Sequence, residues 1–177
     1  MFRLCFIFCI CLFTALVNAA QISRLSPAEG LSQSYVNTLL IDEQGYLWLS
    51  TEGGLNRYDG YQVLDVNGPD GVLDKVQVNY IYQDNLGGIW ITTGIAGLLR
   101  YDPMKDEYRK YIEPPSTEDE FYSNLVNIVL TKDDDHMWVV RTNDVAILNI
   151  HTGKLESEVT LPLDEESGFI RAIYQTQ

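Results

Sequence analysis

Cysteine is absent from this chain after residue 11. All three cysteines lie within the first 11 of the 177 positions, at Cys5, Cys9 and Cys11. The remainder therefore has no disulfide framework and no thiolate nucleophile. Histidine is also scarce: His151 has no cysteine and no second histidine near it in sequence, which argues against a zinc site.

Basic residues are outnumbered by acidic ones. Lysine and arginine together number 12 against 25 aspartates and glutamates, for a formal net charge of −13. Such a surface repels the phosphates of nucleic acids and of anionic lipids, so a nucleic acid is not an expected partner. A neutral or cationic ligand is easier to accommodate. A merely acidic, well-solvated surface is the plainer interpretation.

Apolar residues spaced at the 3.6-residue period of an amphipathic helix are absent from the chain beyond its first 19 residues. Residues 4–17 form an apolar run with one polar residue, preceded by Arg3 and followed by small residues. This order is typical of a signal peptide, and we expect residues 1–19 to be removed on export, with cleavage after Ala20 as an alternative. The run is shorter than the about 20 residues of a membrane span, which disfavours an uncleaved anchor. The mature segment has no second apolar span, so we expect it in a bacterial periplasm without insertion into the membrane.

The rest of the chain repeats one pattern. Three stretches open on Val-Asn and carry a tryptophan 12 residues later: 36–59 (VNTLLIDEQGYLWLSTEGGLNRYD), 78–102 (VNYIYQDNLGGIWITTGIAGLLRYD) and 126–149 (VNIVLTKDDDHMWVVRTNDVAILN). The tryptophans are 42 and 48 residues apart, and a fourth stretch begins at Ile170. A period of this length that carries short apolar strands is the mark of a propeller blade of four antiparallel strands.

The first repeat predicts how each blade is built. Residues 36–41 are nearly all apolar, which is typical of an inner strand buried on both faces. Residues 42–45 (Asp-Glu-Gln-Gly) predict a hairpin turn, because the aspartate can bond nearby backbone and the glycine can take a positive φ. Strands are expected over residues 46–51, 55–58 and 61–66.

These observations predict an all-β fold of four-stranded antiparallel propeller blades, in an incomplete ring of three blades and the first strand of a fourth. The expected division is a signal peptide (1–19), an N-terminal lead-in (20–30), blade 1 (31–68), blade 2 (69–114), blade 3 (115–163) and the start of blade 4 (164–177).

The residues that recur at the blade period are interpreted as structural. Tryptophans at this spacing are expected to pack inside or between blades, with stacking on a sugar as the minor alternative. The third repeat has drifted, since Asp135 stands where the first two repeats have glycine. The recurring set is Asp42, Gly45, Trp48, Tyr58, Asp84, Gly87, Trp90, Tyr101 and Trp138.

The stretches DEQGYLWLSTEGGLNRYDG and DNLGGIWITTGIAGLLRYD resemble the two-component regulator propeller repeat. The resemblance covers residues 31–177 and is weakest in the third repeat. It implies the periplasmic sensor region of a membrane-spanning regulator, with a histidine kinase or a diguanylate cyclase as the output module. We therefore expect this chain to be the N-terminal fragment of such a sensor, since three repeats do not complete the usual ring of seven blades.

The resemblance also implies a partner. Its ligand would be a small molecule, with oligosaccharides as the known class, and a homodimer of the full-length protein is compatible with the same architecture. Two other classes of function stay open: an exported propeller enzyme, such as a lyase or glycosidase, and a scaffold that binds another protein along an open blade edge.

Catalytic residues, cofactors and metals are not expected. The Asp-x-x-Gly-x-x-Trp pattern approaches the Asp box of sialidases, but its Asp and Gly are one residue too far apart. Residues 133–136 (Asp-Asp-Asp-His) could ligate a cation, yet they lack the spacing of a calcium loop, and a solvated turn is preferred. No acid and base pair is set apart in the sequence, so we expect this segment not to be an enzyme.

A ligand, if one binds, is expected at one mouth of the propeller channel. The loops that enter the inner strands and the loops after the second strands lie at the same end of the blades. This placement is a hypothesis that assigns ligand binding to Tyr35, Glu52, Gln77, Tyr122 and Asn143.

Overall fold

The computed structural model describes residues 24–112, 128–141 and 144–160. These residues form three antiparallel sheets of four strands and two short 3-10 helices, η1 (Pro27–Glu29) and η2 (Pro69–Gly71). The first sheet contains β1 (Val36–Ile41), β2 (Leu47–Thr51), β3 (Gly54–Tyr58) and β4 (Val63–Val66). The second contains β5 (Val78–Gln83), β6 (Ile89–Thr93), β7 (Leu98–Asp102) and β8 (Glu107–Ile112). The third contains β9 (Ile128–Thr131), β10 (His136–Val140), β11 (Asp144–Asn149) and β12 (Leu155–Thr160).

Each sheet is a meander of consecutive hairpins, because its strands are hydrogen-bonded in chain order. The turn between β1 and β2 shows the local cause. The Asp42 carboxylate accepts hydrogen bonds from the backbone N–H groups of Gln44 and Tyr46, and Gly45 has φ +88°. In the second sheet, Asp84 accepts from Leu86 and Gly88 in the same way. The aspartate thus satisfies the backbone of a turn that requires a left-handed glycine.

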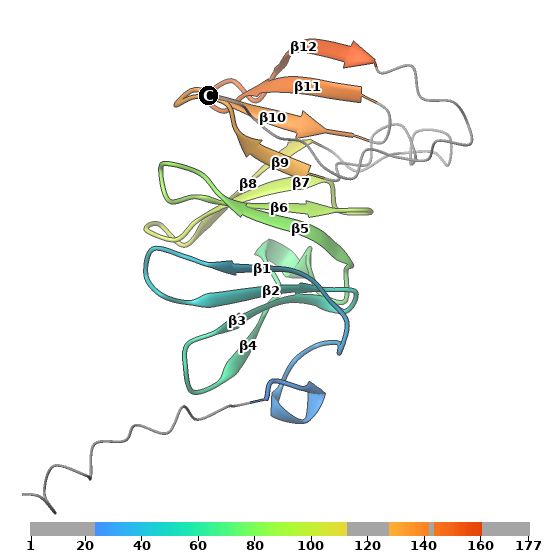
Figure 1. Ribbon diagram of the computed structural model, residues 1–177, viewed down its shortest axis with the longest axis vertical. Coiled ribbons are helices and arrows are strands. Elements are labelled where there is room, and N and C mark those ends of the chain that lie inside the picture. Colours follow the sequence, from blue (N-terminus) through green and yellow to red (C-terminus); the bar gives the residue numbers. More distant parts are fainter. Residues whose placement is uncertain (1–23, 113–127, 142–143, 161–177) are drawn as a thin grey trace, which may run out of the picture.

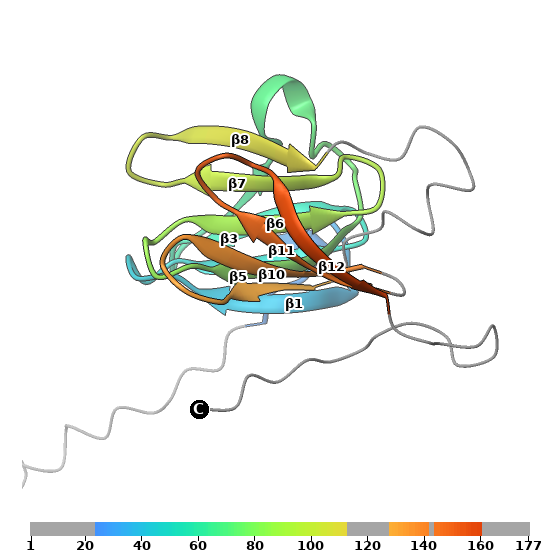
Figure 2. The same ribbon diagram turned by 90° about the horizontal axis from the view of Figure 1, so that it is seen from above.

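The three sheets are stacked face to face along the long axis of the molecule, as Figure 1 shows. β1 lies against β5, and β5 lies against β9. Seen from above, β1 and β5 run along one side of the stack and β8 along the other (Figure 2). The arrangement is that of propeller blades whose first strands face a common axis, and the described part of the chain does not close a ring.

Two apolar cores hold the stack together. One lies between the first and second sheets and includes the buried Trp48, and the other lies between the second and third and includes Trp90. The face of the first sheet that carries Trp48 packs on the second sheet, and the face of the second sheet that carries Trp90 packs on the third. The all-β propeller fold expected from the repeats is therefore confirmed.

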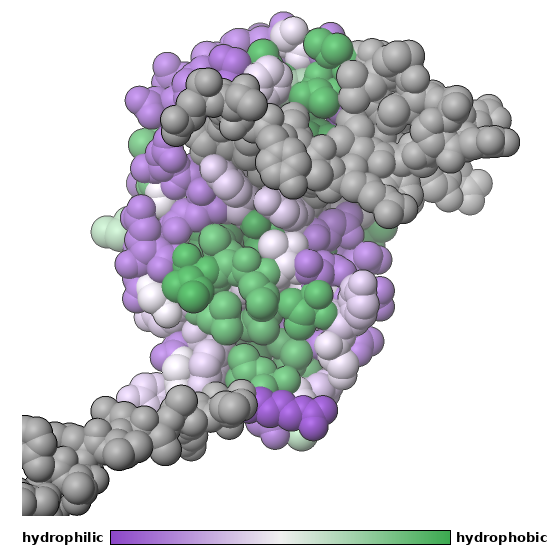
Figure 3. Space-filling model, in the orientation of Figure 1, coloured by the Kyte–Doolittle hydropathy of each residue, from purple (hydrophilic) through white to green (hydrophobic). Residues whose placement is uncertain are grey.

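The expectation that residues 36–41 are buried on both faces is wrong. Exposure alternates along β1, with Leu39 61% and Ile41 70% exposed. Ile81, 42 residues after Leu39, is 2% exposed because its side of the second sheet packs on the first sheet. The corresponding side of the first sheet has no further sheet against it among the described residues. Figure 3 shows apolar side chains gathered over the area through which β1 runs.

The lead-in before β1 covers the other part of this open face. Leu39 pairs with Leu49 and Leu49 with Asn56, so the three share one face. Ser32 donates its backbone N–H to Asn56 Oδ1 at 3.1 Å, and its hydroxyl donates to the same atom at 2.6 Å. Asn56 is fully buried by these contacts. The segment just before β1 is thus fixed to the first sheet by polar contacts.

Candidate functional site: a groove between the first two blades

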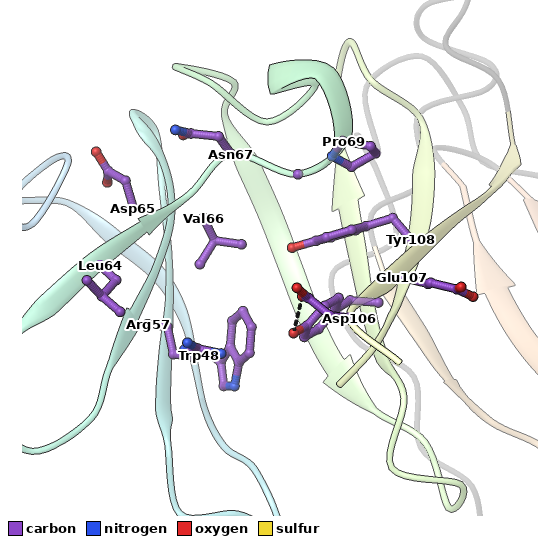
Figure 4. Close-up of a pocket in the computed structure, with 12 residues that line it drawn as sticks. Trp48, Arg57, Leu64, Asp65, Val66, Asn67, Pro69, Asp106, Glu107 and Tyr108 are labelled. Atoms are coloured by element: carbon purple, nitrogen blue, oxygen red, sulfur yellow. Dashed lines mark hydrogen bonds between the residues drawn. The ribbon is translucent and has the colours of Figure 1, made fainter. Parts of the chain in front are cut away.

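A groove of about 700 Å³ opens between the outer parts of the first and second blades (Figure 4). β4 and the segment after it form one wall, and β8 with its preceding turn forms the other. Trp48 and Tyr101, from the two sheets, lie at its base with ring centroids 5.7 Å apart. Arg57, Asp106 and Tyr108 bring polar atoms to it. The groove is therefore a mixed aromatic and charged hollow made by residues from both blades.

Each of the first two blades holds its tryptophan with a buried aspartate. Asp42 Oδ2 accepts a hydrogen bond from the Trp48 indole N–H at 2.8 Å, and Asp84 Oδ2 accepts from Trp90 at the same distance. Both aspartates are 5% exposed. A carboxylate that is hydrogen-bonded in this way fixes the tryptophan that packs against the next blade.

The two blades differ in what else the aspartate binds. In the second blade, Arg100 donates from Nε to Asp84 Oδ2 at 2.7 Å and from Nη2 to Oδ1 at 3.2 Å. Arg57 occupies the equivalent position of the first blade, since Arg57 pairs with Trp48 as Arg100 pairs with Trp90. Arg57 nevertheless makes no ion pair with Asp42.

The residue beside the aspartate explains this difference. Gly88 leaves room for the Arg100 guanidinium, because a Cβ atom on Gly88 would lie 2.1 Å from Cζ of that arginine. The first blade has Tyr46 at this position, four residues after its aspartate. The guanidinium of Arg57 therefore lies over the Tyr46 ring, with Cζ 4.7 Å from the ring centroid, and faces the groove. Its Nε is buried and has no hydrogen-bond partner in the part of the chain that the structure describes.

Two tyrosines form the second-blade wall. The Tyr101 hydroxyl donates to Asp106 Oδ1 at 2.9 Å, and the rings of Tyr101 and Tyr108 are 4.7 Å apart at their centroids. Burial raises the pKa of both hydroxyls, and the charge of Asp106 adds to the rise. Both tyrosines therefore stay protonated at neutral pH and can donate hydrogen bonds.

The residues predicted to bind a ligand lie elsewhere. Tyr35 is 64% exposed, and Glu52 and Gln77 are also exposed. Because Val36 pairs with Thr51, Tyr35 and Glu52 lie at the same end of the first blade, and Gln77 precedes the corresponding strand of the second. Tyr122 and Asn143 lie outside the described residues. None of the three described residues lines the groove, and the role of all five stays a prediction.

The glycines, tryptophans and tyrosines that recur at the blade period differ in burial from one blade to the next. Gly45 and Gly87 have φ of +88° and +79°, and Trp48 and Trp90 are 1% and 0% exposed. The Tyr58 hydroxyl donates to the Gly60 carbonyl at 2.7 Å, whereas Tyr101 is 5% exposed and lies in the first core. Trp138 is only half-buried, on the face of the third sheet that points away from the second.

The third blade replaces the aspartate of the first two. Lys132 precedes Trp138 by six residues, and its Nζ lies 6.0 Å from the centroid of the indole. In the following turn, His136 Nδ1 is 2.6 Å from Asp133 Oδ1, and His136 Nε2 is 3.1 Å from Glu156 Oε2. The hydrogen bond to Asp133 raises the pKa of His136. No group of three candidate metal ligands occurs among the described residues, which include the Asp-Asp-Asp-His turn.

Sequence reasoning did not find the groove. Its signal was present in the difference between Tyr46 and Gly88 at one repeat position, which decides whether the arginine of the third strand binds its aspartate. Reading that signal requires knowing that the arginine, the aspartate and this position meet in space.

Comparison with known proteins supports the predicted resemblance. The family model described as "two component regulator propeller" matches residues 30–53, so the chain carries this repeat. No curated protein matches the chain.

Several solved structures are similar to this chain. One is the extracellular domain of a protein described as a hybrid two-component system from B. thetaiotaomicron, with 28% identity over 76% of this chain and a TM-score of 0.61. A second, from a protein described as a one-component system of the same organism, is 18% identical over 81% of this chain, also at a TM-score of 0.61. This chain spans 20% of each of those two structures.

The propeller fold also occurs in an enzyme. Virginiamycin B lyase from Staphylococcus aureus is 16% identical over 83% of this chain and 47% of its own, with a TM-score of 0.56. That likeness shows the fold alone. The similar structures thus include extracellular domains of a hybrid two-component system and of a one-component system, and a lyase. Among the described residues, no helix is long and apolar enough to cross a membrane.

Proposed function

We propose that this chain belongs to the extracellular, periplasmic sensor region of a membrane-spanning signalling protein. The observation that carries the proposal is the propeller repeat at residues 30–53 on a stack of blades that is 28% identical to the extracellular domain of a hybrid two-component system. The chain itself binds a ligand and does not catalyse a reaction. A sensor histidine kinase is the favoured output module, and a diguanylate cyclase is the alternative.

The proposal also covers how the protein is exported, where it is anchored and where its ligand binds. The first 19 residues act as a signal peptide, and the full-length protein is anchored in the inner membrane with this region outside the cytoplasm. The acidic chain, with a formal net charge of −13, binds a neutral or cationic small molecule, for which an oligosaccharide is the leading class. The ligand occupies the channel mouth near Tyr35, Glu52 and Gln77.

Ligand binding by the purified chain tests the sensing part of this proposal. A panel of neutral oligosaccharides is screened by thermal shift, because a ligand that binds only the folded state raises the melting temperature. Tyr35→Ala should weaken the binding of any hit by roughly tenfold, through loss of a stacking surface. The control is Tyr61→Ala, a substitution at a side chain that is 96% exposed in the turn between β3 and β4. Equal binding by Tyr35→Ala and the unchanged chain would refute the channel-mouth site.

A further inference from the structure

The displaced guanidinium of Arg57 is the feature that the sensor proposal leaves unused. In the second blade the equivalent arginine is bound by Asp84 through two hydrogen bonds. In the first blade, Tyr46 occupies the space that such a contact needs, and Arg57 turns to the groove with a buried Nε–H that no described residue accepts. Nε itself is closed off from the groove, so a ligand there meets the terminal part of the guanidinium, which also offsets part of the rise that burial causes in the pKa of the neighbouring Tyr101 hydroxyl. That part carries a full positive charge and has no carboxylate partner among the described residues, unlike Arg100.

The other groups of the groove suit an acceptor. The Tyr108 hydroxyl points into the hollow, and none of the described residues accepts its proton (Figure 4). Among the carboxylates on the rim, Asp65 and Glu107 point away from the hollow in Figure 4. The Asp65 carboxylate accepts from the amide of Asn56, and Asp106 accepts from the Tyr101 hydroxyl. Arg57 and Tyr108 are therefore two donors at this hollow. Asp65 and Glu107 are turned away from it, whereas Asp106 keeps its charge beside Tyr108 and one oxygen that Tyr101 does not occupy.

Much of the remaining surface of the groove is apolar, although Asn67 also lines it. Leu64 and Val66 come from β4, and the Tyr108 ring stands opposite Val66 across the opening (Figure 4). A second hollow of about 450 Å³ shares Pro69 and Tyr108 with the groove and is also lined by Val72 and Leu99. The space thus admits a flat or ring-shaped body whose faces contact side chains of both blades.

We propose that this groove binds a small ligand that carries a carboxylate on an apolar ring. The carboxylate accepts two hydrogen bonds from the terminal nitrogens of the Arg57 guanidinium, which has no aspartate of the kind that binds Arg100, and a further one from the Tyr108 hydroxyl. The ring lies between Val66 and the Tyr108 ring. The site is separate from the channel mouth, and the inference does not depend on a role in sensing.

Three probes of one shape and different charge test this site. Benzoate, benzamide and benzylamine are titrated into the 15N-labelled protein at pH 7, and the Nε–H resonance of Arg57, identified by its loss in Arg57→Lys, is followed. Benzoate should shift this resonance and bind at least roughly tenfold more tightly than benzamide, because a charge-assisted bidentate contact is stronger than a neutral one. Absence of a benzoate shift, or tighter binding of benzylamine, would overturn the proposal.

Two variants separate the site from a general effect of charge. Tyr46→Gly keeps Arg57 but makes the space that Gly88 provides in the second blade, so the guanidinium should move to Asp42 and benzoate should bind at least roughly tenfold more weakly. Lys105→Gln, at an exposed cation in the turn before β8, should leave binding unchanged. Unchanged binding by Tyr46→Gly would contradict the proposal. If that variant does not fold, Arg57→Lys decides, with benzoate binding followed by the backbone amide resonances of Val66 and Tyr108. It keeps the charge and loses the bidentate contact, so benzoate should bind at least roughly tenfold more weakly, and unchanged binding would contradict the proposal.

Discussion

Gly88 and Arg100 form one structural unit, because the guanidinium of Arg100 occupies the space that a side chain on Gly88 would fill. A Cβ atom there would lie 2.1 Å from Cζ and 2.4 Å from Nε of the arginine. The bare glycine lets the arginine reach Asp84, which also holds the indole of Trp90. One missing side chain thus permits an ion pair that supports the packing of the second blade on the third.

Gly88→Ala should break this unit. The guanidinium is at the free end of a flexible side chain and can move, but the movement separates it from the buried Asp84. We expect a loss of about 2 kcal/mol in the free energy of unfolding, measured by urea denaturation. The matched control is Tyr46→Ala, at the equivalent position of the first blade, which removes a stacking surface and should cost about 1 kcal/mol or less. An equal loss in both variants would contradict this account.

Asp84→Asn should destabilise the chain more than Asp42→Asn. Each substitution weakens the hydrogen bond to an indole and to the turn, but only the first leaves the 15% exposed side chain of Arg100 without its counterion. We expect a cost of about 3 kcal/mol for Asp84→Asn and about 1 kcal/mol for Asp42→Asn. Urea denaturation of Asp84→Asn, of Arg100→Met and of the double variant measures the coupling between the two residues. Additive losses of stability from Asp84→Asn and Arg100→Met would show that the pair does not act as a unit.

Leu39 and Ile81 hold equivalent positions in consecutive blades but differ in burial. Ile81→Ala should cost about 2 to 4 kcal/mol, since it leaves a cavity between the first two sheets. Leu39→Ala, at a side chain that is 61% exposed, should cost less than about 1 kcal/mol. Denaturation of the isolated chain measures both. A large loss for Leu39→Ala would mean that a segment outside the described residues, or another molecule, covers this face.

His136 should titrate above the ordinary histidine pKa of about 6.5. The hydrogen bond to Asp133 is the main cause, and the charge of Glu156 contributes less. A raised pKa in the folded state means that this contribution to stability is fully present below the unfolded pKa and is lost as pH rises through the folded pKa. NMR titration of the His136 ring measures the midpoint.

Variants of the two acids test the cause of that shift. Asp133→Asn should lower the midpoint of His136 more than Glu156→Gln does, since the hydrogen bond to Asp133 is the larger contribution. A midpoint at or below about 6.5 in the unchanged chain would contradict the interaction seen in the structure.

The strands and turns could be predicted because each repeat contains its own local signals. Asp42 and Gly45 fix the turn, and alternation around Trp48 fixes the strands, without information from other blades. The burial of β1 could not be predicted in this way. The run from Val36 to Ile41 has the composition of a strand covered on both faces, but its real exposure depends on whether another sheet packs on it.

The groove depends even more on contacts between distant residues. Arg57 and Arg100 look alike in the sequence, each one residue before a tyrosine. Their different roles arise from Tyr46 and Gly88, which lie just before β2 and β6 and decide whether the arginine reaches its aspartate. The channel-mouth residues, by contrast, follow from topology alone, and Tyr35 lies at the expected end of its blade without any contact that identifies a ligand.

The coding sequence that flanks this chain tests the central claim, membership of a sensor region, most directly. The account predicts further propeller repeats in the same frame, followed by an apolar span of about 20 residues and a histidine-kinase or diguanylate-cyclase module. Flanking sequence that encodes a secreted catalytic domain, with no membrane span and no signalling module, would contradict it. In that case the exported enzyme or the protein-binding scaffold would take its place.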